Sequence, residues 1–440
     1  MPFSCIIEAK RFWLMLYPRE MYLRKIRGFY DHCEIIKIVS GVRRCGKSSL
    51  MEMIQSELVK RGVSKEQIIN FNLDKRPYKR IEKPSQLEKA VDARLKKAGK
   101  GTRYLFIDEV QNVKGFESVV EAYRLEGNIS IFLTGSNSYL LSGELATKLT
   151  GRHILIEMLP LNFEEYEGMK RLFKKPIAAD RDQEFQRYLL EGGFPGEVLL
   201  DSYQDKMAYV SNLIDEIFEK DVKRRLKIRN VDAFNALKNF MIGNYGATMD
   251  RKSLHKAFKS YYPKAVRTQT LDRYLQGMID AKILYECDRF DTKSKVALGG
   301  EKKYYLSDLS FYSTVETDNR INYGPALENV VFQLHKGEGD HLSIGKVGSL
   351  ECDFIVRRGP TEYRYIQVAF TIHDNSASKA LNEKTKSLED REYEPLERIG
   401  NNYPKYVLTL DHFMVERSGI ANVNLLDYLA QEMKPFENGV

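Results

Sequence analysis

Cysteine is scarce in this chain of 440 residues, and the few cysteines do not cluster. No two of them form a C-x-x-C pair, so their spacing argues against both a zinc site and a disulfide framework. The five lie far apart, at Cys5, Cys33, Cys45, Cys287 and Cys352.

Long apolar runs are also missing. No window approaches the ~18 uninterrupted apolar residues that indicate a membrane-spanning helix. The N-terminal stretch FWLMLY (12–17) is too short for the core of a signal peptide and lacks a small-residue cleavage site. These absences predict a cytoplasmic protein that has no membrane partner.

Charge of one sign is not in large excess either. The net charge is +8 and the pI is about 8.9, which permits nucleic-acid binding without requiring it. Hydrophobic residues make up 43% and charged residues 30% of the chain, as expected of a folded protein. The length predicts roughly two to four domains.

Residues 21–160 alternate apolar strands with amphipathic helices, the pattern of an α/β domain. Five strands are predicted at 34–40, 67–73, 103–108, 129–135 and 153–158. Strands joined by helices form a parallel sheet that is covered on both faces. Residues 1–20 precede this domain as an N-terminal extension that fits no predicted element.

Three further segments follow. Residues 161–230 are predicted to be a helical connector, broken at EGGFPGE (191–197) because its Gly and Pro residues disfavour a helix interior. Residues 231–312 show three helices and then a β-hairpin, the order of a winged helix, and Asp250 is expected to cap the second helix. Residues 320–440 return to an α/β pattern.

The strongest motif is GVRRCGKSS (41–49). It matches G-x-x-x-x-G-K-[ST] between a strand and a helix, the context that a phosphate-binding loop requires. Backbone N–H groups of such a loop cradle phosphate oxygens, and the helix N-terminus adds positive charge. We expect Lys47 to contact the β- and γ-phosphates and Ser48 to bind Mg²⁺. The predicted nucleotide contacts are Gly41, Val42, Arg43, Arg44, Cys45, Gly46, Lys47, Ser48 and Ser49.

A second motif, RYLFIDEVQ (103–111), ends an apolar strand with two acids. We expect Asp108 to hold Mg²⁺ through its water shell. Glu109 is expected to orient and deprotonate the attacking water. The adjacent glutamate favours hydrolysis over transfer to a small acceptor.

Two further residues are predicted to take part in hydrolysis. Asn137 follows the strand at 129–135 and is expected, with Thr134 and Ser136, to sense the γ-phosphate; the alternative is a plain strand exit. Arg152 is a candidate for the arginine that stabilises the transition state, in its own chain or in a neighbour. The alternative for Arg152 is an ordinary surface arginine.

Several stretches together resemble a family of bacterial and archaeal AAA-type ATPases, and the resemblance spans nearly the whole chain from Met21. They are GVRRCGKSSL, LFIDEVQ, LTGSNS, LTGRHILIEMLPL, GGFP and REYEPLERIGNNYPKYVLTLD. In that family a P-loop module is followed by a winged helix and a restriction-endonuclease-like C-terminal domain. The resemblance implies ATP as the nucleotide and a sheet of order 5-1-4-3-2. It assigns the Walker residues to Gly41, Gly46, Lys47, Ser48, Asp108 and Glu109.

The winged-helix segment is the candidate for DNA contact. Residues 231–310 hold 14 basic and 9 acidic residues. Basic side chains near the third helix and the hairpin could neutralise phosphates of double-stranded DNA. The alternative is that the segment packs on the ATPase and transmits its state. The candidate DNA contacts are Arg267, Arg273, Lys293 and Lys295, with Lys302 and Lys303 at the base of the hairpin.

The stretch ECDFIVRRGPTEYRYIQVAF (351–370) predicts the strand pair of a metal-dependent nuclease, with Asp353 as its acid. A working site needs carboxylates for Mg²⁺ and a lysine. Gln367 and Ala369 stand where that family has Glu and Lys, and Glu328 is a possible third acid. Glu351 and Lys405 are the alternatives for a missing ligand and the missing lysine, but we expect an inactive scaffold.

The sequence therefore favours an ATPase that needs Mg²⁺ and whose hydrolysis switches or moves the attached modules. One alternative is a DNA-binding regulator in which ATP acts only as a switch. A second is a metal-dependent nuclease. A homo-oligomer is expected if an arginine must reach the nucleotide of a neighbouring chain.

Overall fold

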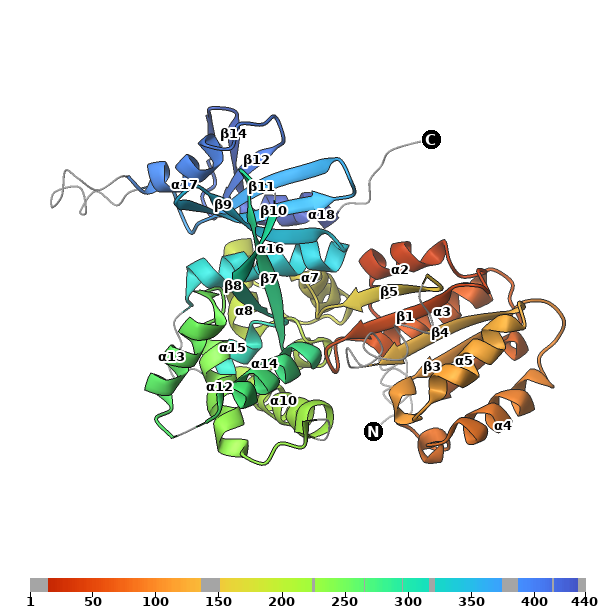
Figure 1. Ribbon diagram of the computed structural model, residues 1–440. Coiled ribbons are helices and arrows are strands. Elements are labelled where there is room, and N and C mark those ends of the chain that lie inside the picture. Colours follow the sequence, from red (N-terminus) through yellow and green to blue (C-terminus); the bar gives the residue numbers. More distant parts are fainter. Residues whose placement is uncertain are drawn as a thin grey trace.

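The computed structural model describes residues 15–135, 151–223, 226–264, 266–294, 296–315, 321–373, 387–413 and 415–433. Its first sheet is fully parallel and has the order β2-β3-β4-β1-β5. This confirms the expected order 5-1-4-3-2. Because all five strands are parallel, their carboxyl ends lie at the same edge of the sheet (Figure 1). The strands are β1 (Ile36–Gly41), β2 (Ile68–Asn72), β3 (Arg103–Asp108), β4 (Ile129–Gly135) and β5 (His153–Met158).

Helices cover both faces of this sheet because alternate strand residues point to opposite sides. Ile38 and Leu105 pack in one apolar cluster with residues of α4 and α5. Val39 and Phe106 pack in another cluster with residues of α2 and α3. The helices of this unit are α2 (Glu20–Arg27), α3 (Lys47–Lys60), α4 (Pro84–Leu95) and α5 (Phe116–Leu125), with short 3₁₀ turns at Lys65–Gln67, Tyr78–Arg80 and Val110–Asn112.

A helical segment follows β5 and carries the chain past the phosphate loop. Its helices are α7 (Phe163–Leu172), α8 (Arg181–Glu191), α9 (Pro195–Val198) and α10 (Tyr203–Ile217), continued by a π-helical turn, η5 (Phe218–Lys223). Between α8 and α9 the GGFP turn packs tightly. A side chain on Gly193 would meet the Leu161 carbonyl oxygen at 2.1 Å, and one on Gly196 would meet the Tyr209 hydroxyl at 2.4 Å.

Three helices and a hairpin come next, in the order expected from the sequence. Asp250 caps α13, accepting a hydrogen bond from the Ser253 backbone N–H at 2.6 Å. The short strand β6 pairs with β8 beside the hairpin. The elements are α12 (Val231–Gly243), β6 (Thr248–Met249), α13 (Arg251–Tyr261), α14 (Thr268–Asp280), β7 (Leu284–Asp291) and β8 (Val296–Leu306).

The hairpin continues directly into the sheet of the C-terminal part. β7 pairs in parallel with β9, which joins two segments into one nine-stranded sheet of order β13-β14-β12-β11-β10-β9-β7-β8-β6. In Figure 1 this sheet rises from the hairpin toward the C-terminal unit. The remaining elements are α15 (Ser310–Val315), α16 (Tyr323–Glu338), β9 (His341–Val347), β10 (Leu350–Arg358), β11 (Glu362–Val368), α17 (Leu388–Glu397), β12 (Lys405–Thr409), β13 (Glu416–Arg417), β14 (Ile420–Asn424) and α18 (Leu425–Met433).

No helix among the described residues is both long enough and apolar enough to cross a membrane.

Candidate active site

The loop between β1 and α3 leaves the carboxyl edge of the sheet and turns tightly into the helix. Gly46 has a φ of +108°, in the left-handed region that favours glycine. At Gly41 a side chain has no room, because a Cβ would lie 2.1 Å from the Met158 carbonyl oxygen on β5. The two glycines of the motif are thus required by the path of the loop.

Lys47 begins α3, and its side chain folds back over the loop. Nζ donates hydrogen bonds to the carbonyl oxygens of Gly41 at 3.1 Å and Val42 at 3.0 Å. An ammonium carries three protons, so one donor remains for a phosphate oxygen. The positive end of the helix dipole lies at the same point and favours an anion there.

Asp108 ends β3 at the centre of a hydrogen-bonded group. Its Oδ2 accepts hydrogen bonds from Ser48 Oγ and Asn72 Nδ2, both at 2.7 Å, and its Oδ1 accepts one from the Thr134 hydroxyl. The structure therefore brings together Ser48 and Asp108, which the two motifs predicted separately. Asn72, at the end of β2, was not predicted, since a lone Asn after a strand carries no specific signal.

Glu109 follows Asp108 with a left-handed backbone, at a φ of 58°. Its N–H donates to Thr134 Oγ1 at 3.0 Å, and its carboxylate accepts a hydrogen bond from the Gln111 side chain. Burial raises the pKa of Glu109, and the neighbouring Asp108 adds to the rise while Lys47 opposes it. A carboxylate with a raised pKa close to the loop suits a general base.

The donor set fits Mg²⁺ bound to a nucleotide. The Ser48 hydroxyl and the Asp108 carboxylate are hard oxygen ligands in direct contact. Among the described residues, no group of three or more His, Cys, Asp or Glu side chains is arranged to hold a metal by itself. Phosphate and water oxygens would therefore have to supply the other ligands.

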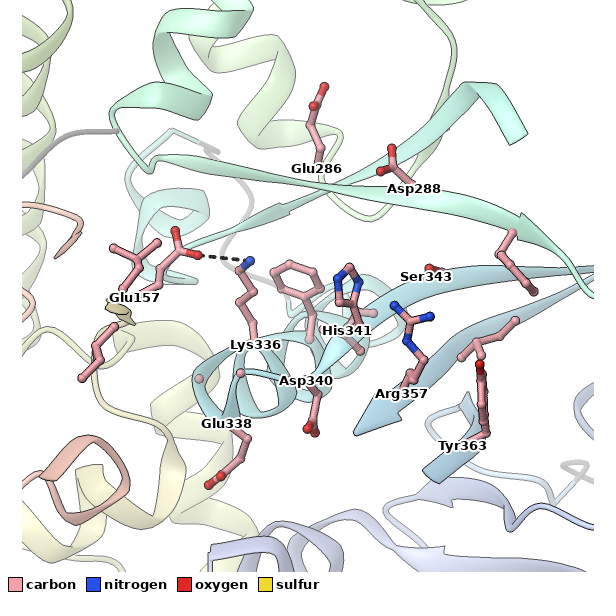
Figure 2. A pocket seen from close by; sticks show the side chains of 18 of the residues that line it. Glu157, Glu286, Asp288, Lys336, Glu338, Asp340, His341, Ser343, Arg357 and Tyr363 are labelled. Carbon is pink, nitrogen blue, oxygen red and sulfur yellow. Dashed lines mark ion pairs between the residues drawn. The ribbon is translucent and has the colours of Figure 1, made fainter. Parts of the chain in front are cut away.

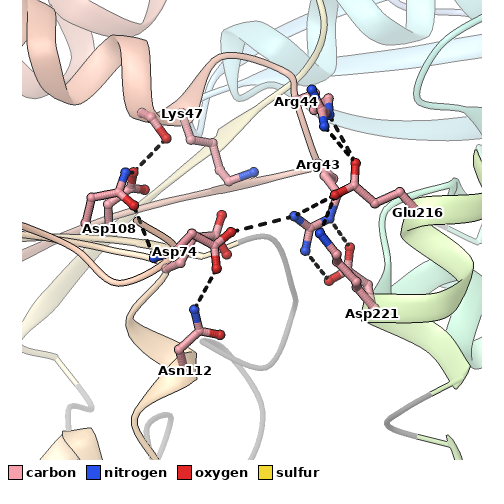
Figure 3. Close-up of polar contacts among 12 residues, drawn as sticks. Arg43, Arg44, Lys47, Asp74, Asp108, Asn112, Glu216 and Asp221 are labelled. Carbon is pink, nitrogen blue, oxygen red and sulfur yellow. Dashed lines mark hydrogen bonds and ion pairs between the residues drawn. The ribbon is translucent and has the colours of Figure 1, made fainter. Parts of the chain in front are cut away.

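Arg43 and Arg44 turn away from the loop toward the helical segment (Figure 3). Arg43 Nε lies 3.0 Å from Asp221 Oδ2, and its NH1 lies 3.8 Å from Glu216 Oε1. Arg44 NH2 lies 3.0 Å from Glu216 Oε2. Their side chains, which the sequence placed among the nucleotide contacts, thus connect the loop to α10 and η5.

Arg19 fixes the other side of the loop. It is 3% exposed, and its Nε pairs with Glu165 at 2.9 Å. Its remaining nitrogens donate to three carbonyl oxygens: Cys45 at 3.1 Å, Leu159 at 2.9 Å and Pro160 at 3.2 Å. One guanidinium therefore joins the loop, the end of β5 and α7. It lies in the stretch that matched no predicted element.

An apolar cavity of about 410 Å³ opens beside the loop. Gly46 and Ser49 form one wall, and α9 contributes Pro195 and Gly196. The rest of the lining comes from the N-terminal stretch, α3 and the helical segment: Met15, Leu16, Tyr17, Arg19, Met53, Leu161, Met169, Phe173, Lys175 and Leu199. The cavity therefore offers a largely apolar space next to the phosphate loop.

Arg152, which was predicted to be catalytic, does not join the site of its own chain. Arg152 precedes β5 at the amino edge of the sheet, opposite the loop, and its NH1 lies 3.0 Å from Glu121 Oε1. Its side chain is 52% exposed and lies at the edge of the sheet opposite the phosphate loop. A role for Arg152 at the nucleotide of a neighbour stays a prediction. Asn137 lies outside the described residues.

The basic residues proposed for DNA contact divide into exposed and paired ones. Arg267, Arg273 and Lys293 are exposed, whereas Lys295 lies outside the described residues. Lys302 pairs with Glu286 within the hairpin at 3.1 Å. Lys303 is 5% exposed, so the expectation that it neutralises a phosphate is wrong.

Three of the acids that the sequence suggested for a nuclease face do come together. Lys303 Nζ lies 2.9 Å from Glu328 Oε2, 3.0 Å from Glu351 Oε1 and 3.5 Å from Asp353 Oδ1. Burial raises the pKa of Glu328 to about 7 and also raises that of Asp353. Burial alone would lower the pKa of Lys303, but the surrounding carboxylates raise it. Lys303 was not predicted to lie here.

Gln367 and Lys405 were also suggested for this face, and both make other contacts. Gln367 accepts a hydrogen bond from the Asp353 backbone N–H at 3.3 Å and donates one to Glu392 at 3.0 Å. Lys405 Nζ donates to the Ile399 carbonyl oxygen. Lys405 therefore does not replace the missing lysine of the motif.

A second cavity, of about 720 Å³, lies between β5, α16 and the fork of β7 and β9. Figure 2 shows Glu157 and Lys336 paired on one wall, with Arg357 and Tyr363 on another. Burial raises the pKa of Glu157, but Lys282 and Lys336 outweigh it and hold that pKa below the usual value. This cavity has no part in the phosphate site.

Comparison with known proteins matches residues 34–167 to the AAA domain family and residues 182–320 to a domain family of unknown function. An uncharacterized protein of Haemophilus influenzae is 30% identical over 417 residues, which cover 94% of this chain and 98% of that protein. An uncharacterized protein of Methanocaldococcus jannaschii is 29% identical over 369 residues, covering 81% of this chain and 79% of its own. A Walker-type ATPase structure of Pyrococcus abyssi aligns with 68% of this chain and 96% of its own, at a TM-score of 0.49 and 16% identity.

The fold, the loop and the sequence match together define an AAA-type P-loop ATPase domain in the N-terminal part of the chain. Because the H. influenzae relative matches along almost its whole length, the chain belongs to the same family as that protein.

Proposed function

We propose that the chain binds ATP with Mg²⁺ and hydrolyses it. The observation that carries this proposal is the group in which Ser48, Asp108, Glu109 and Thr134 meet beside Lys47. Lys47 and the loop N–H groups bind the β- and γ-phosphates, and the apolar cavity beside Gly46 receives the base. Ser48 and Asp108 hold Mg²⁺, whose charge neutralises phosphate oxygens.

Glu109 acts as the general base in this proposal. Its carboxylate accepts a proton from the attacking water, and its position is fixed by Gln111 and by the backbone bond to Thr134. Asp108 is tied by three donors and serves as a ligand instead. The two adjacent acids therefore take separate tasks.

Two variants separate binding from hydrolysis. Lys47→Ala removes the charge that faces the phosphates, so titration with fluorescent ATP should show at least about a hundredfold loss of affinity. Glu109→Gln keeps the shape and loses the base, so ATP affinity stays while phosphate release falls roughly 10²–10⁴-fold. Normal ATP turnover by Glu109→Gln would overturn the mechanism.

The nucleotide state drives the attached modules in this proposal, with residues 231–312 as a winged helix and residues 320–440 as an endonuclease-like unit. The helix–helix–helix–hairpin order and the exposed Arg267, Arg273 and Lys293 support contact with double-stranded DNA. A gel shift at several salt concentrations, with and without ATP, tests this. Affinity should fall steeply with salt and drop further in Arg267→Gln/Arg273→Gln. Absence of binding at low salt would make the unit a protein-contact element.

A homo-oligomer in which Arg152 reaches a neighbour's nucleotide is part of the same proposal, because Arg152 is exposed and lies away from its own loop. Arg152→Ala and Glu109→Gln would each be inactive alone. Mixed in equal amounts, they should recover part of the ATPase rate, since some interfaces then pair an intact Arg152 with an intact Glu109. No recovery would rule out a role at a neighbour's nucleotide, and a normal ATPase rate for Arg152→Ala alone would return Arg152 to a surface role.

A further inference from the structure

The endonuclease-like resemblance implies a divalent metal held by Glu328 and Asp353, but the residues present do not fit one. The Lys303 ammonium stands at the point where Glu328, Glu351 and Asp353 converge, 2.9–3.5 Å from one oxygen of each. Oxygens bind Mg²⁺ at about 2.0–2.1 Å and Ca²⁺ at about 2.3–2.6 Å. The spacing suits an ammonium, and an ion at this point would collide with Nζ.

The three carboxylates of the cluster also have protein partners without a metal. An ammonium has three protons, and three carboxylates face it. Glu328 also accepts a hydrogen bond from the Tyr305 hydroxyl, and Asp353 accepts one from the Val368 N–H, both at 2.9 Å. Glu351 forms a second ion pair, with Arg289 NH2 3.5 Å from its Oε2. Neither Gln367 nor Lys405 adds a charge to this group.

We propose that Lys303 is a built-in cation that takes the place of a metal ion, and that the resulting cluster fastens the β7–β8 hairpin to the C-terminal unit. Lys303 and Arg289 come from the hairpin, whereas the three carboxylates come from α16 and β10. The pairing of β7 with β9 crosses the same junction. The nuclease-like face therefore joins two segments of the chain instead of cutting nucleic acid.

The first test is metal binding to the full-length chain. Asp108→Asn provides the background, because it removes the ligand at the phosphate site. Mn²⁺ binding is followed by electron paramagnetic resonance. The Asp108→Asn protein and the Asp108→Asn/Asp353→Asn protein should give the same Mn²⁺ titration curve. A Mn²⁺ site lost in Asp353→Asn, or Mn²⁺-dependent nicking of plasmid DNA lost in that derivative, would overturn the proposal.

The second test is the coupling of Lys303 to its acids. Lys303→Met leaves buried carboxylates uncompensated, so the melting temperature should fall by at least about 5 °C. Lys303→Met and Asp353→Asn together should lower it by clearly less than the sum of the single changes.

The matched control for this double-mutant cycle is Lys302→Met. Lys302 is the neighbour of Lys303 on β8, and its ion-pair partners lie in its own hairpin. It should change the melting temperature by no more than about 2 °C. If Lys303→Met does not fold, Lys303→Arg takes its place in the cycle with Asp353→Asn. Strictly additive shifts would overturn the proposal.

Discussion

Arg19 shows how far the phosphate site depends on a side chain outside every motif. Its guanidinium is buried, pairs with Glu165 and donates to the carbonyl oxygens of Cys45 in the loop and of Leu159 after β5. We expect Arg19→Met to lower the free energy of unfolding by about 3–5 kcal/mol, because Glu165 is left as an unpaired buried charge. Nucleotide affinity should fall as well, since Cys45 loses its anchor. Thermal melting and ATP titration measure the two effects.

The control for Arg19→Met is Arg398→Met. Arg398 pairs with Glu394 on the surface of α17 and is 51% exposed, so its loss should cost less than about 1 kcal/mol. Equal melting temperatures for Arg19→Met and Arg398→Met would show that Arg19 does not hold the loop.

The raised pKa of Glu109 predicts how the rate of ATP hydrolysis depends on pH. Burial raises its pKa above the ordinary value of a glutamate, which is about 4.3. A general base must be deprotonated, so kcat for ATP should fall as pH falls through this raised pKa. The acid limb of the kcat profile should therefore lie above the ordinary glutamate range. A kcat that stays constant down to the ordinary pKa range of glutamate, in protein shown by circular dichroism to remain folded, would contradict a general-base role for Glu109.

Residues of the site could be predicted only where chemistry and local pattern coincide. Lys47 and Ser48 belong to one contiguous motif, and Asp108 and Glu109 end one strand. Arg19 acts on residues far along the chain, with Glu165 146 positions away. No spacing rule reports such a contact, which only the packing of β5 and α7 creates.

At the scale of elements, the phosphate loop is connected to α10 and η5 by ion pairs. Arg43 and Arg44 neutralise Asp221 and Glu216 close to where phosphates are expected. Asp221→Asn keeps the side-chain shape and removes one negative charge near the loop. We expect roughly two- to fivefold tighter ATP binding at low salt, with the gain shrinking as salt is added. Titrations at two ionic strengths measure this.

Arg43→Gln is the counterpart of Asp221→Asn. It removes a positive charge at the same place, so ATP binding should weaken, and the two variants should move in opposite directions. If both variants weaken binding equally, the ion pair acts through the shape of the loop and not through its charge.

The strand pairing of the first sheet could be predicted from the sequence, but that of the second sheet could not be predicted in full. The strands of the first sheet are short and mostly apolar, and β1, β2 and β3 are each followed by a helix, so their parallel arrangement could be predicted. The pairing of residues 289–291 with 344–346 could not, because a parallel pair between distant strands leaves no local signal. The segments at 231–312 and 320–440 were therefore predicted as separate units, although their strands share one sheet.

At the scale of the whole molecule, the C-terminal part also packs against α2 and against the start of α7. Lys25 Nζ donates to the Gly337 carbonyl oxygen, Arg24 pairs with Glu338, and Asn162 Nδ2 contacts Met433 Sδ at 3.2 Å. Apolar residues from α2 to α18 belong to one buried cluster. Removing the C-terminal part would therefore expose apolar surface on the rest of the molecule.

We expect that, when the chain is cut between residues 318 and 319, the longer fragment folds stably only together with the shorter one. Expressed alone, residues 1–318 should aggregate, because β7 loses its pairing with β9, Lys303 loses its carboxylates and part of the apolar cluster is exposed. Co-expressed with residues 319–440, they should elute together in gel filtration. Lys303→Met in the longer fragment should weaken this association and Lys302→Met should not. A monodisperse, cooperatively melting 1–318 fragment with no affinity for 319–440 would show that the nine-stranded sheet is not needed for folding.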